Sequence, residues 1–126
     1  MKPKRKFFQI LVGSALVFVT CRALNAKEPL YDGLGSYSRK ITTDSREAQR
    51  YFDQGLAFLY GFNHRAAIHA FQQAAELDPE CAMAHWGVAL ACGPHINFTA
   101  VPPPAAELAW KELELTQENS GNASPV

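Results

Sequence analysis

A chain of 126 residues is long enough for one small domain, and a hydrophobic content of 48% allows that domain a packed core. The 12 basic and 12 acidic side chains balance, but five basic residues and no acidic ones lie within the first 26 positions. Residues 27–126 therefore carry 7 basic against 12 acidic residues, a net charge of −5, which gives no electrostatic basis for nucleic-acid binding.

Residues 1–26 are typical of a signal peptide for export. A basic stretch precedes an apolar run of 15 residues from Phe7 to Cys21, and Ala26 offers a small residue for cleavage. A transmembrane helix needs about 20 residues, so the run is short for a membrane span. We therefore predict an exported protein, periplasmic or extracellular. Anchoring through an uncleaved signal segment is the alternative, and a lipid anchor on Cys21 is a weaker one.

Helix-forming segments predict an all-α fold. Residues 27–44 form an irregular lead-in, since they contain Gly, Pro, Ser and Thr without a helical period. Four helices are then expected, over 45–60, 64–77, 81–92 and 105–117. The segment 93–104 should be a loop, because it holds three consecutive prolines, and the polar tail 118–126 is predicted to be disordered.

Several residues mark the ends of these helices. Asp44 and Glu47 have the spacing of a capping box for the first helix. Gly61 is expected to end that helix, and Asn63 to cap the second. Pro79 is expected in the first turn of the third helix, where its missing N–H costs nothing.

The first two helices match the signature of a tetratricopeptide repeat. The signature is a large residue, a small residue four positions later and an aromatic three after that, then Ala-x3-Phe and a closing Pro. It is met at Tyr51, Gly55, Phe58, Ala67, Phe71 and Pro79. The small residues allow the two helices to cross closely. We expect this repeat to span 48–81.

A second, less regular repeat is expected over 82–117. The pattern recurs 34 residues on at His85, Val88, Ala89 and Cys92. After a loop about five residues longer, Ala106 and Trp110 reproduce the Ala-x3-aromatic pair. The alternative is a four-helix bundle in which the small residues match by chance.

A closer resemblance covers residues 31 to 126. It is carried by Leu34-Gly35-Ser36-Tyr37, the run from Glu47 to Leu56, Phe62-Asn63-His64, the run from Asp78 to Ala91, and Gly93-Pro94-His95-Ile96-Asn97. The chain resembles the N-terminal portion of a family of exported bacterial tetratricopeptide-repeat proteins. Members of that family are much longer, so the resemblance implies a longer repeat protein, and it brings no catalytic residue.

The first helix also carries a candidate partner-binding groove. By the usual geometry of the repeat, its groove-facing positions are Gln49, Phe52, Leu56, Leu59 and Tyr60. A helix that is apolar on nearly all sides is normally buried on all sides. Either a protein or peptide partner covers this face, or the lead-in around residues 31–37 does. The lead-in is favoured because it has no other evident anchor.

Metal and disulfide chemistry receive little support from the spacing. Cys81 and His85 lie four apart and share a helix face, as metal ligands do. Together with Cys92 and His95, however, they span about 21 Å of helix, so they cannot meet at one ion. The two cysteines are about 16 Å apart along a helix, beyond the reach of a disulfide. We assign them to the core, and we assign no metal, cofactor or catalytic residue.

The leading hypothesis is therefore an exported scaffold that binds a protein or peptide and is not an enzyme. One alternative is a metal- or redox-linked accessory protein that uses Cys81 and His85. Another is a truncated product without independent function. Repeat arrays need about three units or a polar cap to cover their ends. We thus expect residues 27–126 alone to be only marginally folded, or to self-associate through the last helix, which carries Leu108, Trp110, Leu113 and Leu115.

Overall fold

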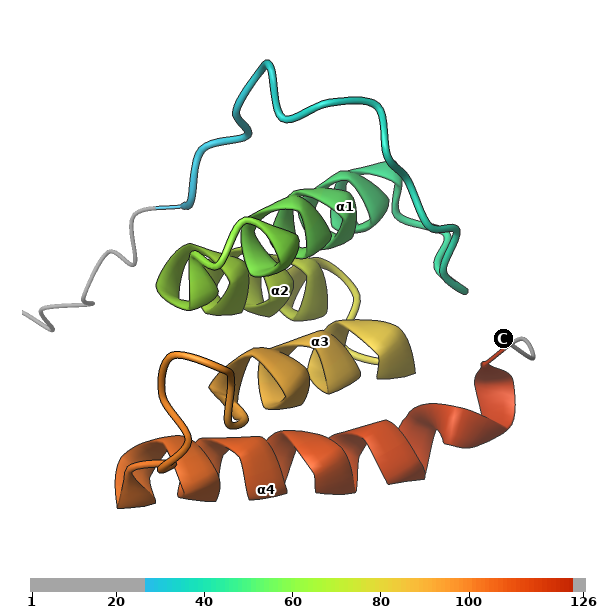
Figure 1. Ribbon diagram of the computed structural model, residues 1–126. Helices are drawn as coiled ribbons and strands as arrows, with labels where there is room; N and C mark the ends of the chain where they lie inside the picture. The colour runs from blue at the N-terminus through green and yellow to red at the C-terminus, as the bar shows by residue number, and fades with distance from the viewer. Residues whose placement is uncertain (1–26, 124–126) are drawn as a thin grey trace, which may run out of the picture.

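Four helices follow one another as successive layers of a stack (Figure 1). The computed structural model describes residues 27–123, so the predicted signal segment lies outside it. The helices are α1 (Arg46–Tyr60), α2 (His64–Leu77), α3 (Ala82–Cys92) and α4 (Pro103–Asn119), and a 3-10 turn, η1 (Ser120–Asn122), follows. Within the described range no strand forms, and only an isolated bridge joins His95 to Phe98. The predicted all-α fold is confirmed.

Helix α1 is capped by Ser45 and not by the predicted Asp44. The Ser45 hydroxyl accepts the N–H of Ala48 at 3.1 Å, which satisfies one of the free amides of the first turn. The predicted partner of the capping box, Glu47, binds Lys27 at 2.5 Å instead. The capping box is therefore wrong, because the helix begins one residue later than expected and Ser45 takes the cap position.

The turn between α1 and α2 places its left-handed residue at an unexpected position. Gly61 ends α1 as predicted, but its φ is −80°, whereas Phe62 has a φ of 59°. Such a φ is unfavourable for a bulky residue. The N–H of Asn63 bonds to the Phe58 carbonyl at 2.8 Å and closes the turn. The Asn63 side chain then accepts from Ala66, which confirms it as the cap of α2.

Two other helix ends differ from the prediction. Pro79 lies in a turn before α3 and not in its first turn, because the Cys81 N–H bonds to the Asp78 carbonyl. Helix α4 begins at Pro103, with proline at its first turn. It continues to Asn119, so the loop is 93–102, and the tail predicted to be disordered begins with helical structure.

The core is centred on Phe71 of α2, which is fully buried between α1 and α3. A Cβ atom added to Gly55 of α1 would lie 2.5 Å from the Phe71 ring, and one added to Gly87 of α3 would lie 2.6 Å from it. Both glycines therefore allow a close approach of the backbone to this ring. Phe52 lies against the same ring, with centroids 5.4 Å apart. The predicted close approach at Gly55 is thus a contact with an aromatic side chain.

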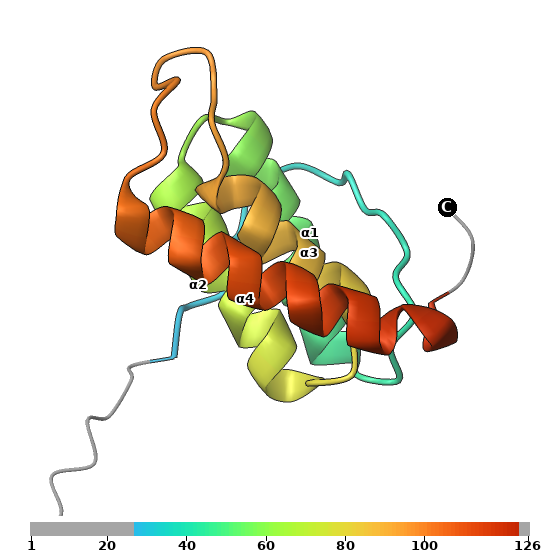
Figure 2. The same ribbon diagram turned by 90° about the horizontal axis from the view of Figure 1, so that it is seen from below.

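Helix α4 packs across α3 at the far end of the stack (Figure 2). Glu112 is its only fully buried residue, and Ala105, Leu108 and Ala109 are partly buried. The predicted Ala-x3-aromatic pair is wrong here, since Ala106 is exposed and Trp110 is 68% exposed. Glu112 faces α3, and a residue two positions away points to the opposite side of a helix.

Candidate functional site

The five predicted groove residues of α1 do not form one open groove. Phe52 and Leu56 are buried, at 0% and 2% exposure, because Phe52 packs on Phe71 and both belong to the core. Leu59 is partly buried against the same core. Tyr60 is exposed and meets Tyr37 edge-on. Gln49 remains as the one polar member, and it binds the lead-in.

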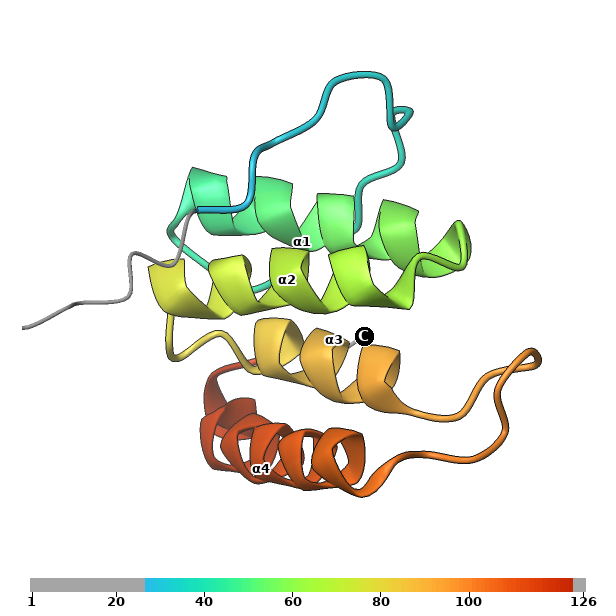
Figure 3. The same cartoon turned by 90° about the vertical axis from the view of Figure 1, so that its left-hand side faces the viewer.

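The lead-in, residues 27–44, lies along α1 on the side away from α2 (Figure 3). This arrangement agrees with the interpretation that the lead-in covers the helix. The hydrogen bonds come from its two ends, 27–31 and 38–41, whereas the predicted centre contributes the edge-on contacts of Tyr31 with Phe58 and of Tyr37 with Tyr60. Residues 31–38 are exposed, and Gly33 and Gly35 have φ of 83° and 89°. Two separate segments of extended chain are therefore held, with an exposed arch between them.

Gln54 holds the first segment by its backbone. Its Oε1 accepts the N–H of Tyr31 at 2.8 Å, and its Nε2 donates to the carbonyl of Pro29 at 2.9 Å. Gln54 is itself only 5% exposed. Near it, the Tyr51 hydroxyl donates to the carbonyl of Glu28 at 2.6 Å. Three backbone groups of this segment are thus satisfied by side chains of α1.

Gln49 holds the second segment in the same way. Its Oε1 accepts the N–H of Ile41 at 3.0 Å, and its Nε2 donates to the carbonyl of Arg39 at 2.9 Å. Asp53 adds two contacts, since it accepts the N–H of Arg39 at 3.0 Å and the hydroxyl of Ser38 at 2.7 Å. Ile41 is buried, at 4% exposure. This segment is therefore fixed by its backbone and by one aliphatic side chain.

We call these two contacts the Gln54 clamp and the Gln49 clamp. In each, one side-chain amide meets the carbonyl of residue i and the N–H of residue i+2. These two groups point to the same side of an extended chain. They are the groups that one residue of a parallel neighbouring strand would bind, so each glutamine amide takes the place of the N–H and C=O of one such residue.

An ion pair holds the start of the lead-in. Lys27 Nζ lies 2.5 Å from Glu47 Oε1, with both side chains about half exposed. The hydrogen bond to Glu47 raises the pKa of Lys27. A pair this exposed contributes little to stability, because water and salt screen it. It orients the segment next to the Gln54 clamp.

Sequence reasoning missed the roles of Gln54 and Asp53. Gln54 stands at a position of the repeat where an apolar residue is usual, and the repeat pattern gives Asp53 no role. A polar side chain at a position that should be buried needs a hydrogen-bond partner. That departure was the available signal, but it could not name the backbone groups that Gln54 binds.

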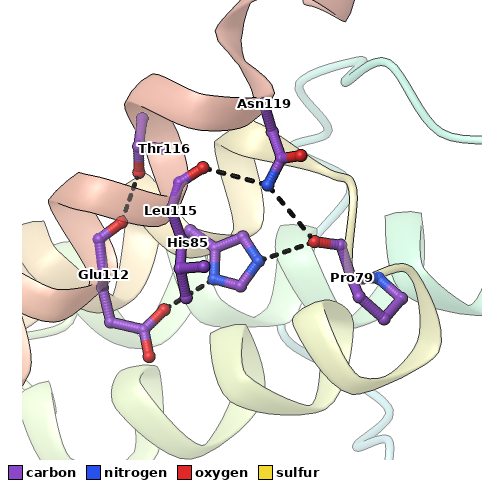
Figure 4. A network of polar contacts seen from close by, with 6 residues as sticks. All are labelled: Pro79, His85, Glu112, Leu115, Thr116 and Asn119. Carbon is purple, nitrogen blue, oxygen red and sulfur yellow. Dashed lines mark hydrogen bonds and ion pairs between the residues drawn. The ribbon is translucent and has the colours of Figure 1, made fainter.

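His85, one of the two residues of the metal-binding alternative, is held by other contacts (Figure 4). His85 is buried, with Nδ1 2.6 Å from Glu112 Oε2 and Nε2 2.9 Å from the carbonyl of Pro79. A carbonyl can only accept, so Nε2 carries a proton. The contact with Glu112 needs one further proton, held by the imidazole or by the carboxyl group. Both ring nitrogens are therefore engaged, and neither is free to bind a metal.

The other candidate ligands are also placed elsewhere. Cys81 and Cys92 are free thiols, and burial raises the pKa of each. His95 lies in the loop before α4 and stacks on His64, with ring centroids 3.9 Å apart. Among residues 27–123, no group of three or more His, Cys, Asp or Glu side chains could hold a metal ion.

A pocket of about 580 Å³ lies where the start of α1 meets the turn between α2 and α3 and the end of α4. Asp44, Asp78 and Glu80 are among its lining residues. The Thr43 hydroxyl donates to Asp78 across one wall, at 2.5 Å. The pocket is polar and acidic, and it lies apart from the two clamps.

Comparison with known proteins adds no assignment to this geometry. No protein-family model, no curated protein and no solved structure matches the chain. In the part of the chain that the structure describes, no helix combines the length and apolar character needed to cross a membrane.

Proposed function

We propose that the chain is the N-terminal part of an exported tetratricopeptide-repeat protein that acts as a scaffold for protein interaction. In this proposal it binds an extended segment of a partner protein and carries out no catalysis. The support is the repeat signature of the first hairpin, the export-type N-terminus and the way in which α1 holds extended chain.

The observation that carries the proposal is the pair of clamps on α1. A helix surface that satisfies six backbone groups of an extended segment is built to hold extended chain. Unpaired backbone groups are costly when they leave water, so a surface that pairs them can hold a strand without a sheet. The lead-in supplies that strand on α1.

The neighbouring helix α3 offers the open continuation of this surface. Met83, Trp86 and Leu90 stand 34 residues after Gln49, Phe52 and Leu56. Met83 and Trp86 are half-buried, and Leu90 is 44% exposed. Met83 lines the pocket beside Thr42 and Thr43 of the lead-in, whereas Trp86 and Leu90 lie outside that lining. We therefore expect the partner segment to pack along Trp86 and Leu90.

Site-specific photo-crosslinking tests this placement in the native host. A photoreactive residue in place of Leu90 should give a discrete crosslinked product with another protein. The matched control is the same substitution at His69, which is exposed on α2. Equal crosslinking from both positions, or none from Leu90, would contradict the proposal.

The export part of the proposal has its own test. Intact-mass measurement of protein from the native cell envelope should find a chain that begins at Lys27. A mature protein that retains residues 1–26 would instead support the membrane-anchored alternative.

No observation favours the metal or redox alternative. The two nitrogens of His85 are hydrogen-bonded to Glu112 and Pro79, and the Cys81 thiol is buried and unpaired. A reactive cysteine needs a lowered pKa and exposure, whereas burial raises the pKa of this one.

A further inference from the structure

The two clamps recognise backbone atoms and very little else. Of the large apolar side chains in the lead-in, Tyr31, Leu34 and Tyr37 are 51%, 38% and 59% exposed. Ile41 alone is fully buried, and Leu30 is partly buried. A surface that binds backbone groups does not distinguish one sequence from another, so specificity here depends on one aliphatic position.

The lead-in is also held loosely enough to leave. Its contacts with α1 are six backbone hydrogen bonds, the Ser38 hydroxyl contact, one exposed ion pair, and the burial of Ile41 and, in part, Leu30. Each such hydrogen bond replaces one with water, so its net contribution is small. The arch between the clamps adds only the edge-on contacts of two half-exposed rings, Tyr31 on Phe58 and Tyr37 on Tyr60. Tethering keeps the lead-in at an effective concentration of about millimolar, and this tether is what a competitor must overcome.

We propose that this face of α1 is a binding site for an extended segment of a partner protein, and that the lead-in is its resident, displaceable occupant. The inference rests on the proposed scaffold function and adds a second, self-covered site to it. The ligand has an aliphatic residue with a free N–H at the place of Ile41. Glu47 pairs with Lys27 on this face, so the segment should also carry a cation at that place.

A peptide that copies residues 27–44, labelled with a fluorophore, is the probe, and the protein is the full chain. Ile41→Asn weakens the resident lead-in without changing α1. Fluorescence anisotropy should show the peptide binding at least about tenfold more tightly to this variant than to the wild type, because the competitor is weaker. Equal binding to both proteins, or binding to neither, overturns the proposal.

The Gln49 clamp is tested on both partners. Gln49→Glu, added to Ile41→Asn, removes the donor to the peptide carbonyl and should abolish the gain in peptide affinity. The control is Gln117→Glu on the exposed side of α4, which should leave that gain unchanged. In the peptide, N-methylation at Ile41 removes the N–H that Gln49 accepts. N-methylation at Lys40 is the matched control, since alternate residues of an extended chain point their N–H groups to opposite sides. Equal effects of the two methyl groups overturn the clamp.

A further peptide identifies the kind of ligand. It keeps Ile41 and the basic residues and replaces the other side chains. Binding within about tenfold of the copy supports a foreign partner, because backbone recognition tolerates such changes. If only the true copy binds, the site serves the lead-in of a second copy of the chain, and the proposal is overturned.

Hydrogen exchange in the wild-type chain keeps the question decidable if Ile41→Asn fails to fold. Excess peptide should expose the amides of Tyr31 and Ile41, and leave those of α2 protected. Unchanged protection of both amides overturns the displacement. This outcome is independent of the Leu90 crosslink. If the Leu90 crosslink fails but the peptide still exposes the amides of Tyr31 and Ile41, the scaffold function is refuted. If the crosslink forms but these amides stay protected, only this site is refuted.

Discussion

The two helical hairpins are closed by different means. In the first, the ring of Phe71 on α2 packs against α1, and Gly55 lets the α1 backbone approach it. In the second, α3 and α4 meet through small residues and the buried pair of His85 and Glu112. Aromatic packing is non-directional and tolerates small shifts, whereas a buried polar pair requires both partners in place.

Helix α4 is fixed to the stack by fewer buried residues than α1. Only Glu112 of its 17 residues is fully buried, whereas α1 buries six residues. The lead-in covers the outer face of α1, but the outer face of α4 leaves Trp110 and Leu113 exposed, at 68% and 40%. The first hairpin is thus closed by its own chain. The second depends on the contact of His85 with Glu112, a longer hydrogen bond from Asn119 to the carbonyl of Pro79, and a partly buried apolar strip.

The largest expected effect comes from filling the space beside Phe71. Gly55→Leu adds a Cβ that would lie 2.5 Å from a fully buried ring, and three more carbons behind it. Overpacking typically costs about 1–3 kcal/mol, and here both the ring and the helix backbone would have to shift. We expect about 3 kcal/mol, seen by circular dichroism as a melting temperature lowered by more than about 10 °C.

Gly121→Leu is the matched control for this change. A Cβ at Gly121 meets nothing within 4 Å, so the same substitution there should leave the melt nearly unchanged. If Gly55→Leu melts like the control, then the ring of Phe71 does not lie against α1 and the account of the first hairpin is wrong.

The second effect tests the polar closure of the other hairpin. Glu112→Ala leaves Nδ1 of His85 buried without its partner, which should lower the free energy of unfolding by about 2 kcal/mol. Glu112→Gln retains a side chain that can donate to Nδ1 and should recover most of that loss. Urea denaturation measures both, with Glu107→Ala on the exposed face of α4 as control. Equal midpoints for Glu112→Ala and Glu107→Ala would show that the pair does not hold α4.

The same difference between hairpins decided what the sequence could predict. The four helices, the cap at Asn63 and the close approach at Gly55 follow from local pattern, because each depends on neighbours in the chain. The register of α4 does not, because Ala106 and Trp110 imitate the pair Ala67 and Phe71. Nothing local shows that Glu112 reaches a histidine 27 residues earlier. The long-range polar contact overrode the repeat pattern.

The candidate site was predictable in outline only. That the lead-in lies on α1 followed from an apolar helix that needs a cover. Which atoms make the contact did not follow, since Phe52 and Leu56 turned out to be core residues and Gln54 a clamp. Backbone recognition leaves no sequence motif in the segment that is recognised.

Self-association through α4 is the third expected effect. Trp110 and Leu113 expose apolar surface on the outer face, and burying it between two copies would be favourable. Sedimentation velocity at several concentrations should show weak association of residues 27–126. Trp110→Lys with Leu113→Lys should weaken it about tenfold or more, a change of about 1.4 kcal/mol. His69→Lys on α2 serves as control. A monomer at all concentrations would refute the expectation of an open end.

The smallest expected effect is a loss of folding stability at alkaline pH, which comes from the thiols of the second hairpin. Cys81 is the N-cap residue of α3 and Cys92 is its last residue, whereas no cysteine lies within α1 or α2. Burial raises the pKa of both thiols above the ordinary value of 9.0. Above about pH 9 the unfolded chain therefore loses thiol protons that the folded chain keeps. The unfolded state then binds fewer protons, so stability falls as pH rises.

The contribution of the thiols is thus fully present below pH 9 and is lost as pH rises through their raised pKa. Replacing both residues, with Cys81→Ala and Cys92→Ala, should make stability fall less steeply between pH 8 and pH 10. Urea midpoints under reducing conditions measure the two slopes. Lys27 loses its bond to Glu47 at still higher pH, because its own pKa is raised, and it does so in both proteins alike. Identical slopes would mean that the thiols titrate as freely in the folded chain as in the unfolded one, which their burial against α3 and its neighbours does not allow.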